Sequence, residues 1–140
     1  MYDSCLEKQQ KLLSRFFHKE KQEQYALIID MGKELPPFPP SQKKASNLVE
    51  GCQSALYLFV ENPSKENFTF NIDSESMISK GLGALLVAIY NGEPAQTLLQ
   101  CPPTCLEKLH LSSLLSFNRS SGLNALLLRL KKEALSTLCF

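Results

Sequence analysis

Apolar residues recur every three to four positions over the first 35 residues, the spacing that places side chains on one face of an α-helix. In the first segment, residues 6–17, this face carries Leu6, Leu12, Leu13, Phe16 and Phe17. In the second, residues 22–35, it carries Tyr25, Ile28, Ile29 and Leu35. Prolines at positions 36, 37, 39 and 40 then end the helical pattern, because proline lacks an amide donor and has a fixed φ. A polar loop is expected over 41–47.

The pattern changes to a period of two in the middle of the chain. Residues 54–61 are bulky and apolar on both alternating faces, which predicts a well-covered strand. Phe68, Phe70 and Ile72 alternate with polar residues, which predicts a half-exposed strand. Asn62-Pro63-Ser64 is typical of a turn, so the two strands are predicted to form a hairpin. Residues 47–50 are a candidate third extended piece.

A central helix is predicted after the hairpin, ending near Tyr90. Ser74 or Ser76 can cap its start, and Asn91-Gly92 suits its end. The small residues at 81, 83 and 84 indicate close packing against the sheet.

Three further helices are expected. Pro94 favours the start of a short one, Thr104-x-x-Glu107 matches a capping box for another, and Ser120 or Ser121 can cap the last. The last helix has an apolar face of Leu123, Leu126, Leu127, Leu130 and Ala134. The order of helices, strands and helices predicts an α+β fold, with helices packed on one face of a small antiparallel sheet.

The composition narrows the class of protein. With 140 residues, 44% apolar and 21% charged, the chain is expected to be one globular domain, 1–140. A formal charge of +1 argues against a nucleic-acid partner. No run reaches the ~18 apolar residues that span a bilayer, and the first residues do not match a signal peptide. A cytoplasmic location without membrane contact is therefore expected.

Five cysteines are present, and one of them has a distinctive context. Cys52 follows Gly51, which lets the backbone turn sharply, and a predicted strand begins just after it. A thiol at the tip of such a turn is well placed to act as a nucleophile. Most free cysteines are nevertheless buried and structural, so local spacing alone favours the structural reading.

The other cysteines and the histidines fit structural roles. Cys5 and Cys139 lie near the chain ends, and the spacing of Cys101 and Cys105 is not that of a zinc or thioredoxin-type site. No metal site is expected. A cysteine hydrolase needs a histidine base, and neither His18 nor His110 carries a recognisable motif.

Four sequence blocks carry a family resemblance. In order, they are Tyr25–Gly32 followed by Leu35-Pro36; Val49-Glu50-Gly51-Cys52-Gln53-Ser54; Asp73-Ser74 followed by Ile78–Leu82; and Asn118–Leu123, which should precede the last helix. Their order and spacing resemble the SufE family over residues 20 to 135. The resemblance implies a SufE/IscU-like α+β fold.

The resemblance also implies a function. A SufE-like protein accepts persulfide sulfur from a pyridoxal-phosphate cysteine desulfurase (SufS-like), stimulates that enzyme, and passes the sulfur to a SufBCD-like scaffold for iron–sulfur cluster assembly. Cys52 matches the sulfur-carrying cysteine. The cofactor belongs to the desulfurase, so none is expected on this chain. The oligomeric state stays open, a homodimer included.

Supporting roles follow from the same blocks. Gly51, Gln53 and Ser54 flank Cys52, and Ser54 can hydrogen-bond its loop. Arg119 is either a surface residue before a helix or a cation near Cys52 or the docking surface; its match to the fourth block favours the second reading. Asp73 either caps the next helix, itself or through its neighbours, or contacts the Cys52 loop.

Shielding and movement of the thiol are expected as well. Leu56, Leu58 and Phe59 can shield a tucked Cys52, and the loop 47–53 is hypothesised to swing out when the desulfurase docks. Gly122 is expected to serve helix entry.

Two other classes of function remain open. One is a scaffold that assembles iron–sulfur clusters itself, which requires several converging thiolates. The other is a desulfurase-binding module that transfers no sulfur.

Overall fold

The elements follow the expected order of helices, strands and helices. The computed structural model describes residues 2–52, 54–109, 111 and 115–139. Its helices are α1 (Asp3–Arg15), α2 (Lys21–Lys33), α3 (Met77–Tyr90), α4 (Ala95–Gln100), α5 (Thr104–Lys108) and α7 (Phe117–Leu138). Two short 3₁₀ turns, η1 (Pro40–Gln42) and η2 (Ala45–Asn47), precede the strands β1 (Leu56–Pro63) and β2 (Phe68–Ser74).

The two strands form the predicted antiparallel hairpin, in which Leu56 pairs with Ser74 and Pro63 with Phe68. The first strand extends through Pro63, so the turn begins at Ser64, two residues later than expected. The candidate third extended piece is reduced to a single bridge between Leu48 and Tyr57. It is this short because residues 45–47 coil into η2.

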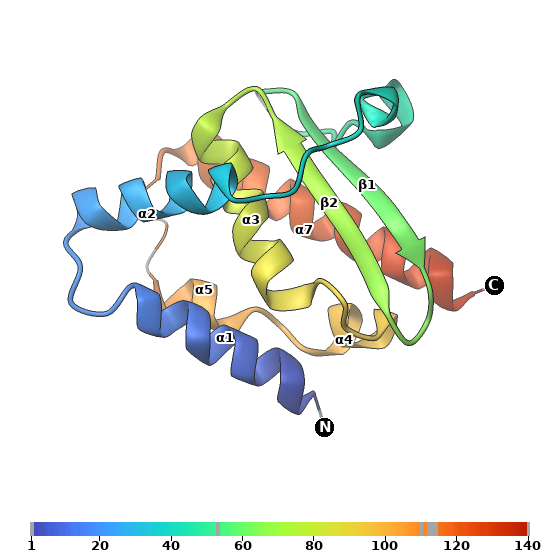
Figure 1. The fold of residues 1–140 in the computed structure, drawn as a ribbon, viewed down its shortest axis with the longest axis horizontal. Coiled ribbons are helices and arrows are strands. Elements are labelled where there is room, and N and C mark those ends of the chain that lie inside the picture. Colours follow the sequence, from blue (N-terminus) through green and yellow to red (C-terminus); the bar gives the residue numbers. More distant parts are fainter. Residues whose placement is uncertain (1, 53, 110, 112–114, 140) are drawn as a thin grey trace.

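The helices pack on one face of the hairpin, as predicted (Figure 1). Leu58, Phe70 and Ile72 are buried on this face, where α3 contacts β2 and α7 contacts β1. On the opposite face the connection after α2 crosses the strands, and the ring of Phe38 lies 6.3 Å from those of Tyr57 and Phe59. The proline-rich segment therefore covers part of the second face.

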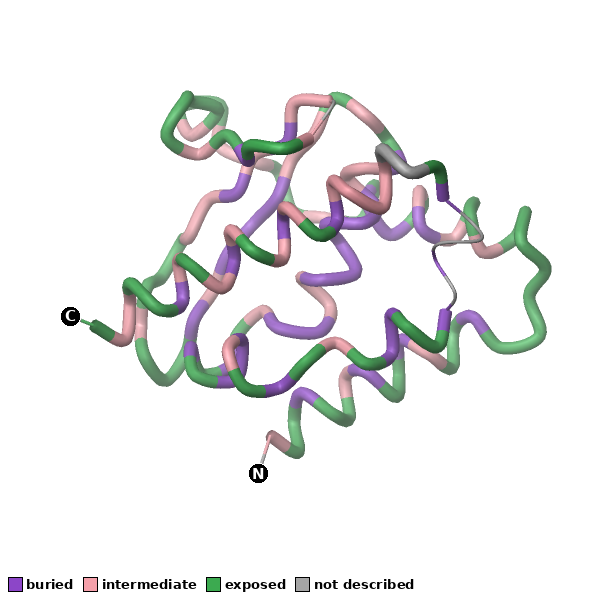
Figure 2. Tube along the Cα trace, turned by 180° about the vertical axis from the view of Figure 1, so that it is seen from behind, coloured by how far each residue is buried: buried purple, intermediate pink, exposed green. Residues whose placement is uncertain are grey.

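The central helix α3 is the middle of the core. Figure 2 shows buried segments gathered along α3 and the strands, whereas α1 turns exposed residues outward. Gly83 does pack against the sheet, because a Cβ there would lie 2.5 Å from the Ile72 side chain. Gly81 does not: a Cβ there would lie 2.2 Å from the carbonyl oxygen of Ile28 in α2. Close approach of α2 and α3 thus explains Gly81.

The faces of the first two helices differ from the prediction. Leu6, Phe17 and Tyr25, all placed on apolar faces, are exposed. On α1 the positions that contact the core include Cys5 and Gln9, with Leu12 and Phe16. The helical spacing was recognised, but the apolar pattern did not include the buried Cys5 and Gln9.

The helix starts show one confirmed cap and three corrections. Ser76 caps α3, with its hydroxyl accepting from the amide of Ser79, as one of the two alternatives expected. The last helix begins at Phe117 and is capped by Ser116 rather than Ser120 or Ser121. Pro94, expected at the first helical position, instead precedes α4, which begins at Ala95. Pro103 precedes α5, so Thr104, expected to cap this helix, is its first residue. Each side-chain cap contributes about 1 kcal/mol to helix stability.

Within the described residues, no helix is long and apolar enough to cross a membrane.

Candidate functional site

Cys52 lies on the loop between η2 and β1, against the first turns of α7. Its thiol is half-buried and donates a hydrogen bond to the carbonyl oxygen of Gly122, with a sulfur–oxygen distance of 3.7 Å. A Cβ on Gly122 would lie 3.7 Å from the same sulfur. The thiol is therefore seated directly on the helix backbone, with space beside Gly122 for about one methyl group at contact distance.

The turn before the thiol requires glycine. Gly51 has φ +91°, a conformation that residues with a side chain rarely adopt. A Cβ at this position would also approach Cβ of Ala125 in α7 to 3.3 Å. The predicted sharp turn at Gly51 is confirmed, and the structure adds that this turn rests on α7.

A small pocket surrounds the thiol. The residues that line it come from the Cys52 loop, β1, α3 and α7: Cys52, Ser54, Leu56, Ser79, Leu82, Arg119, Gly122, Leu123 and Leu126. Its cavity volume is about 10 Å³, which is at the lower limit for one water molecule. The pocket therefore leaves almost no room for a second atom of the size of sulfur.

Arg119 lines this pocket together with Cys52. Its guanidinium Nη1 donates to the hydroxyl of Ser54 at 3.0 Å and to that of Ser79 at 2.9 Å. Two neutral hydroxyls therefore hold the cation between the Cys52 loop and α3. The fourth sequence block lies within α7 rather than before it, and this places Arg119 on the first turn, facing the site.

Burial raises the pKa of the Cys52 thiol above its ordinary value. The sulfur is thus a protonated thiol near neutral pH, and its hydrogen bond to Gly122 is consistent with that state. A thiol must ionise to act as a nucleophile. In this arrangement burial therefore favours the protonated, less nucleophilic form of Cys52.

Asp73 is not itself the cap of α3; its neighbour Ser76 caps the helix, as one of the expected alternatives has it. Its carboxylate lies 2.9 Å from Nζ of Lys43 and 3.4 Å from Nζ of Lys80. Burial alone would raise the pKa of Asp73, but the hydrogen bond and charge of Lys43, with the charge of Lys80, hold it below its ordinary value. Asp73 instead ties β2 to the loop that precedes the cysteine segment and to α3.

The remaining expectations for the site have mixed outcomes. Ser54 receives its hydrogen bond from Arg119. Of the three apolar residues expected to shield Cys52, Leu56 lines the pocket, whereas Leu58 points into the core and Phe59 faces Phe38. Gln53 lies outside the described residues.

Two site residues were not recognised as such from the sequence. Ser79 belongs to the third sequence block, so its presence there was a usable signal. Gly122 was assigned to helix entry, but it lies inside α7 and its carbonyl accepts from the thiol. Only the packing of the loop on the helix reveals that contact.

Three other cysteines gather around one buried amide. Nε2 of Gln9 lies 3.7 Å from both the Cys5 and the Cys101 sulfur, and Oε1 of Gln9 accepts from the backbone amide of Cys105. Burial raises the pKa of Cys5 to about 12 and that of Cys105 to about 11. All three cysteines are buried, which fits the structural role expected for them, and Cys5 is fully buried although it lies near the chain end.

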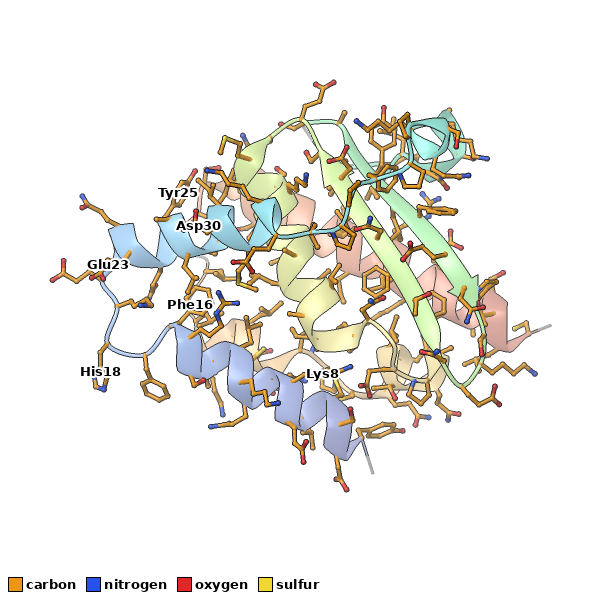
Figure 3. All side chains as sticks on the ribbon, viewed as in Figure 1. Lys8, Phe16, His18, Glu23, Tyr25 and Asp30 are labelled. Atoms are coloured by element: carbon orange, nitrogen blue, oxygen red, sulfur yellow. The ribbon has the colours of Figure 1, made fainter. Side chains whose placement is uncertain are left out.

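His18 lies on the turn between α1 and α2 and points away from the body of the molecule (Figure 3). It is exposed and lines a wide cavity of about 730 Å³ with Phe16 and Lys108, apart from the Cys52 pocket. His110 lies outside the described residues. Among the residues that the structure describes, no group of three or more His, Cys, Asp or Glu side chains could hold a metal ion.

The comparison with family models matches residues 10–134 to SufE, described as an Fe-S metabolism associated domain. The chain belongs to the SufE family. The match begins about ten residues earlier than the resemblance of the sequence blocks did, and so includes part of α1.

Named relatives agree with the SufE assignment. The chain is 36% identical over 116 residues to the cysteine desulfuration protein SufE of Wigglesworthia glossinidia brevipalpis, covering 81% of this chain and 79% of that protein. It is 30% identical to an uncharacterized SufE-like protein of Rhizobium etli, covering 84% and 82%.

A plant relative is much longer. The chain is 33% identical over 117 residues to the SufE-like protein 1, chloroplastic/mitochondrial, of Arabidopsis thaliana, covering 84% of this chain but 32% of that protein. The chain therefore spans about a third of the plant protein's length and about four fifths of the length of the bacterial relatives.

The fold also matches a solved structure, the solution structure of a hypothetical protein from Thermus thermophilus. The TM-score is 0.78 at 21% identity, and the match covers 95% of this chain and 97% of the other. This likeness shows that the α+β fold is that of an experimentally observed protein.

Proposed function

We propose that this protein accepts sulfur from a pyridoxal-phosphate cysteine desulfurase and holds it as a persulfide on Cys52. The protein stimulates the desulfurase and passes the sulfur on for iron–sulfur cluster assembly. The observation that carries this proposal is the seat of the thiol. Cys52 follows a glycine with positive φ and lies half-buried in a pocket that also contains the guanidinium of Arg119. Membership of the SufE family supports the same reading.

The transfer needs only thiol chemistry. The Cys52 thiolate attacks the terminal sulfur of the desulfurase's cysteine persulfide, and a new sulfur–sulfur bond forms as the old one breaks. The desulfurase cysteine leaves as a thiolate, and the persulfide now resides on Cys52. The number of sulfur–sulfur bonds is unchanged, so no oxidant or reductant is consumed.

The resting site must open for this reaction. The pKa of Cys52 is raised by burial, and the cavity of about 10 Å³ has almost no room for an added sulfur atom. We infer that desulfurase docking draws the Cys52 loop away from Gly122. Exposure would lower the thiol pKa and clear a path to the donor persulfide.

Arg119 is proposed to assist once the loop has moved. Its cation donates to the neutral hydroxyls of Ser54 and Ser79, so a thiolate or persulfide anion could replace one of them as a partner. A guanidinium beside sulfur stabilises the anionic form and so favours transfer.

Mass spectrometry tests the proposal directly. The full chain is incubated with a cysteine desulfurase, pyridoxal phosphate and cysteine, and its peptides are analysed without reduction. One added sulfur atom on Cys52 is expected. Cys139→Ser, which removes an exposed cysteine, should accept sulfur like the native chain, whereas Cys52→Ser should accept none.

The mass spectra and two further assays separate the other functions. Sulfur on Cys101 or Cys105 in place of Cys52 would refute the assignment of the site. Desulfurase stimulation that survives in Cys52→Ser would indicate a binding module without transfer. Cluster assembly on this chain would give visible absorption after anaerobic loading with iron and sulfide, and none is expected.

A further inference from the structure

One face of α7 packs against the chain segment that leads to Cys52. Gly122, Ala125 and Arg129 are spaced by three and four residues, so they lie on the same side of the helix. Gly122 contacts the Cys52 sulfur, and Ala125 contacts the turn at Gly51. The chain before Cys52 therefore runs along this helix face.

Arg129 is the polar end of this face. Its Nη1 donates to the carbonyl oxygen of Leu48 at 3.0 Å, and its Nη2 donates to that of Ser46 at 2.5 Å. The third donor, Nε, lies 3.0 Å from the carboxylate of Glu133 one turn further on. Glu133 thus orients the guanidinium so that its two remaining nitrogens face the loop backbone.

The carbonyls that Arg129 binds belong to the entry of the Cys52 loop. Just after them, the amide of Val49 donates to the carbonyl of Leu56 at 2.8 Å, which closes the base of the loop. A shift of residues 46–48 along α7 would therefore displace the loop base and, with it, the turn at Gly51 and the thiol at Gly122.

We propose that Arg129 is a positioning residue for Cys52. Its hydrogen bonds to the Ser46 and Leu48 carbonyls fix the position of the loop along α7 and so keep the thiol against Gly122. The inference deepens the proposed function, and rests on it for its relevance to sulfur transfer. The guanidinium geometry matters, because a planar fork can bind two carbonyls at once and an ammonium cannot do so in the same way.

The test measures the Cys52 thiol itself. Alkylation of the full chain with iodoacetamide is followed by peptide mass spectrometry as a function of pH. In Arg129→Ala the loop base is released, and Cys52 is expected to react about fivefold faster, the factor that corresponds to the net loss of one ordinary hydrogen bond. Because the thiol is less buried, its pH–rate profile should also move to lower pH.

Two variants sharpen this experiment. Lys132→Ala removes an exposed cation from the same helix and should alkylate like the native chain. Arg129→Lys keeps the charge but not the fork, and an intermediate rate is expected, about twofold above native. If Arg129→Ala fails to fold, the alkylation rate of Cys52 in Arg129→Lys tests the proposal instead.

Native rates and an unshifted profile in the Arg129 variants would refute the proposal. So would a rise in the desulfurase KM with unchanged alkylation, since Arg129 would then be a docking residue. The assay needs no desulfurase. A faster Cys52 in Arg129→Ala supports the positioning role even if the native chain accepts no sulfur, which would refute the proposed function alone.

Discussion

The site of Cys52 and the cluster of Cys5, Cys101 and Cys105 differ in backbone setting, burial and hydrogen bonding. Cys52 lies on a loop with a glycine turn, and its half-buried sulfur has a weak hydrogen bond to one carbonyl. Cys5, Cys101 and Cys105 come from α1 and the α4–α5 region and are buried around Gln9. The comparison indicates that the position of the thiol on a loop after a glycine turn, rather than the thiol itself, separates the candidate sulfur carrier from the buried cysteines.

The largest expected difference is in chemical reactivity. A pKa of about 12 for Cys5 leaves roughly a thousandth of the thiolate that an ordinary cysteine has near neutral pH. We expect iodoacetamide to modify Cys52 fully before Cys5 or Cys105 reacts, as followed by peptide mass spectrometry. Labelling of Cys105 within tenfold of the rate of Cys52 would contradict the comparison. The exposed Cys139 serves as the internal control for reagent activity.

Alkaline pH should weaken the fold through the buried thiols. Burial raises the pKa of Cys5 to about 12 and that of Cys105 to about 11, above the ordinary value of 9.0. Above that value the unfolded chain loses protons that the folded chain keeps, so stability falls as pH rises toward the folded pKa. The fall should approach about 1.4 kcal/mol per pH unit for each thiol.

Urea unfolding at several alkaline pH values measures that slope. Cys5→Ser removes one titrating group and should flatten the pH dependence, whereas the exposed Cys139→Ser should leave it as in the native chain. An equal slope in all three proteins would show that the buried thiols do not control alkaline stability.

Gln9 should be important for the cysteine cluster and unimportant for Cys52. Its side chain accepts from the Cys105 amide at 3.1 Å and donates to the Pro102 carbonyl at 3.1 Å. Gln9→Leu leaves these groups without that partner, which should lower the free energy of unfolding by about 2 kcal/mol. Chemical denaturation checks this, with the exposed Gln10→Leu as the matched control. A loss of Cys52 sulfur acceptance in the folded Gln9 variant would contradict the separation of the two regions.

The smallest effect is expected from Gly122→Ala, which should change stability and sulfur transfer in opposite directions. The new methyl group would lie at ordinary contact distance, 3.7 Å, from the Cys52 sulfur. The helix should gain up to about 1 kcal/mol, because alanine favours helix over glycine. Sulfur acceptance should fall about fivefold, since the methyl takes room beside the thiol.

Thermal unfolding and the sulfur-transfer assay together test this prediction. Asn124→Ala, exposed on the same helix, should leave sulfur transfer unchanged. Full transfer in a stabilised Gly122→Ala protein would mean that the incoming sulfur never occupies the space beside Gly122.

Much of the architecture could be predicted because it depends on local rules. The proline run ends α2, alternating residues give β2, and the leucines at 123, 126 and 130 bury one face of α7. The predictions fall short where the role of a residue depends on neighbours that are distant in the sequence. Gln9 is buried because three cysteines and a backbone amide surround it, and Gly81 is small because α2 crosses there. The sequence pattern around Gln9 or Gly81 does not reveal these neighbours.

For the site, the sequence by itself determined that Gly51-Cys52 forms a turn before a strand, since positive φ is a property of glycine, and it marked Arg119 as worth attention. Only the tertiary structure decided what those residues touch. Gly122 and Arg129 are 70 and 77 positions beyond Cys52 along the chain, and they meet the Cys52 loop because burial of the leucine face turns the adjacent side of α7 toward it. Packing, which depends on all the elements at once, thus sets where the thiol sits and how strongly it is held.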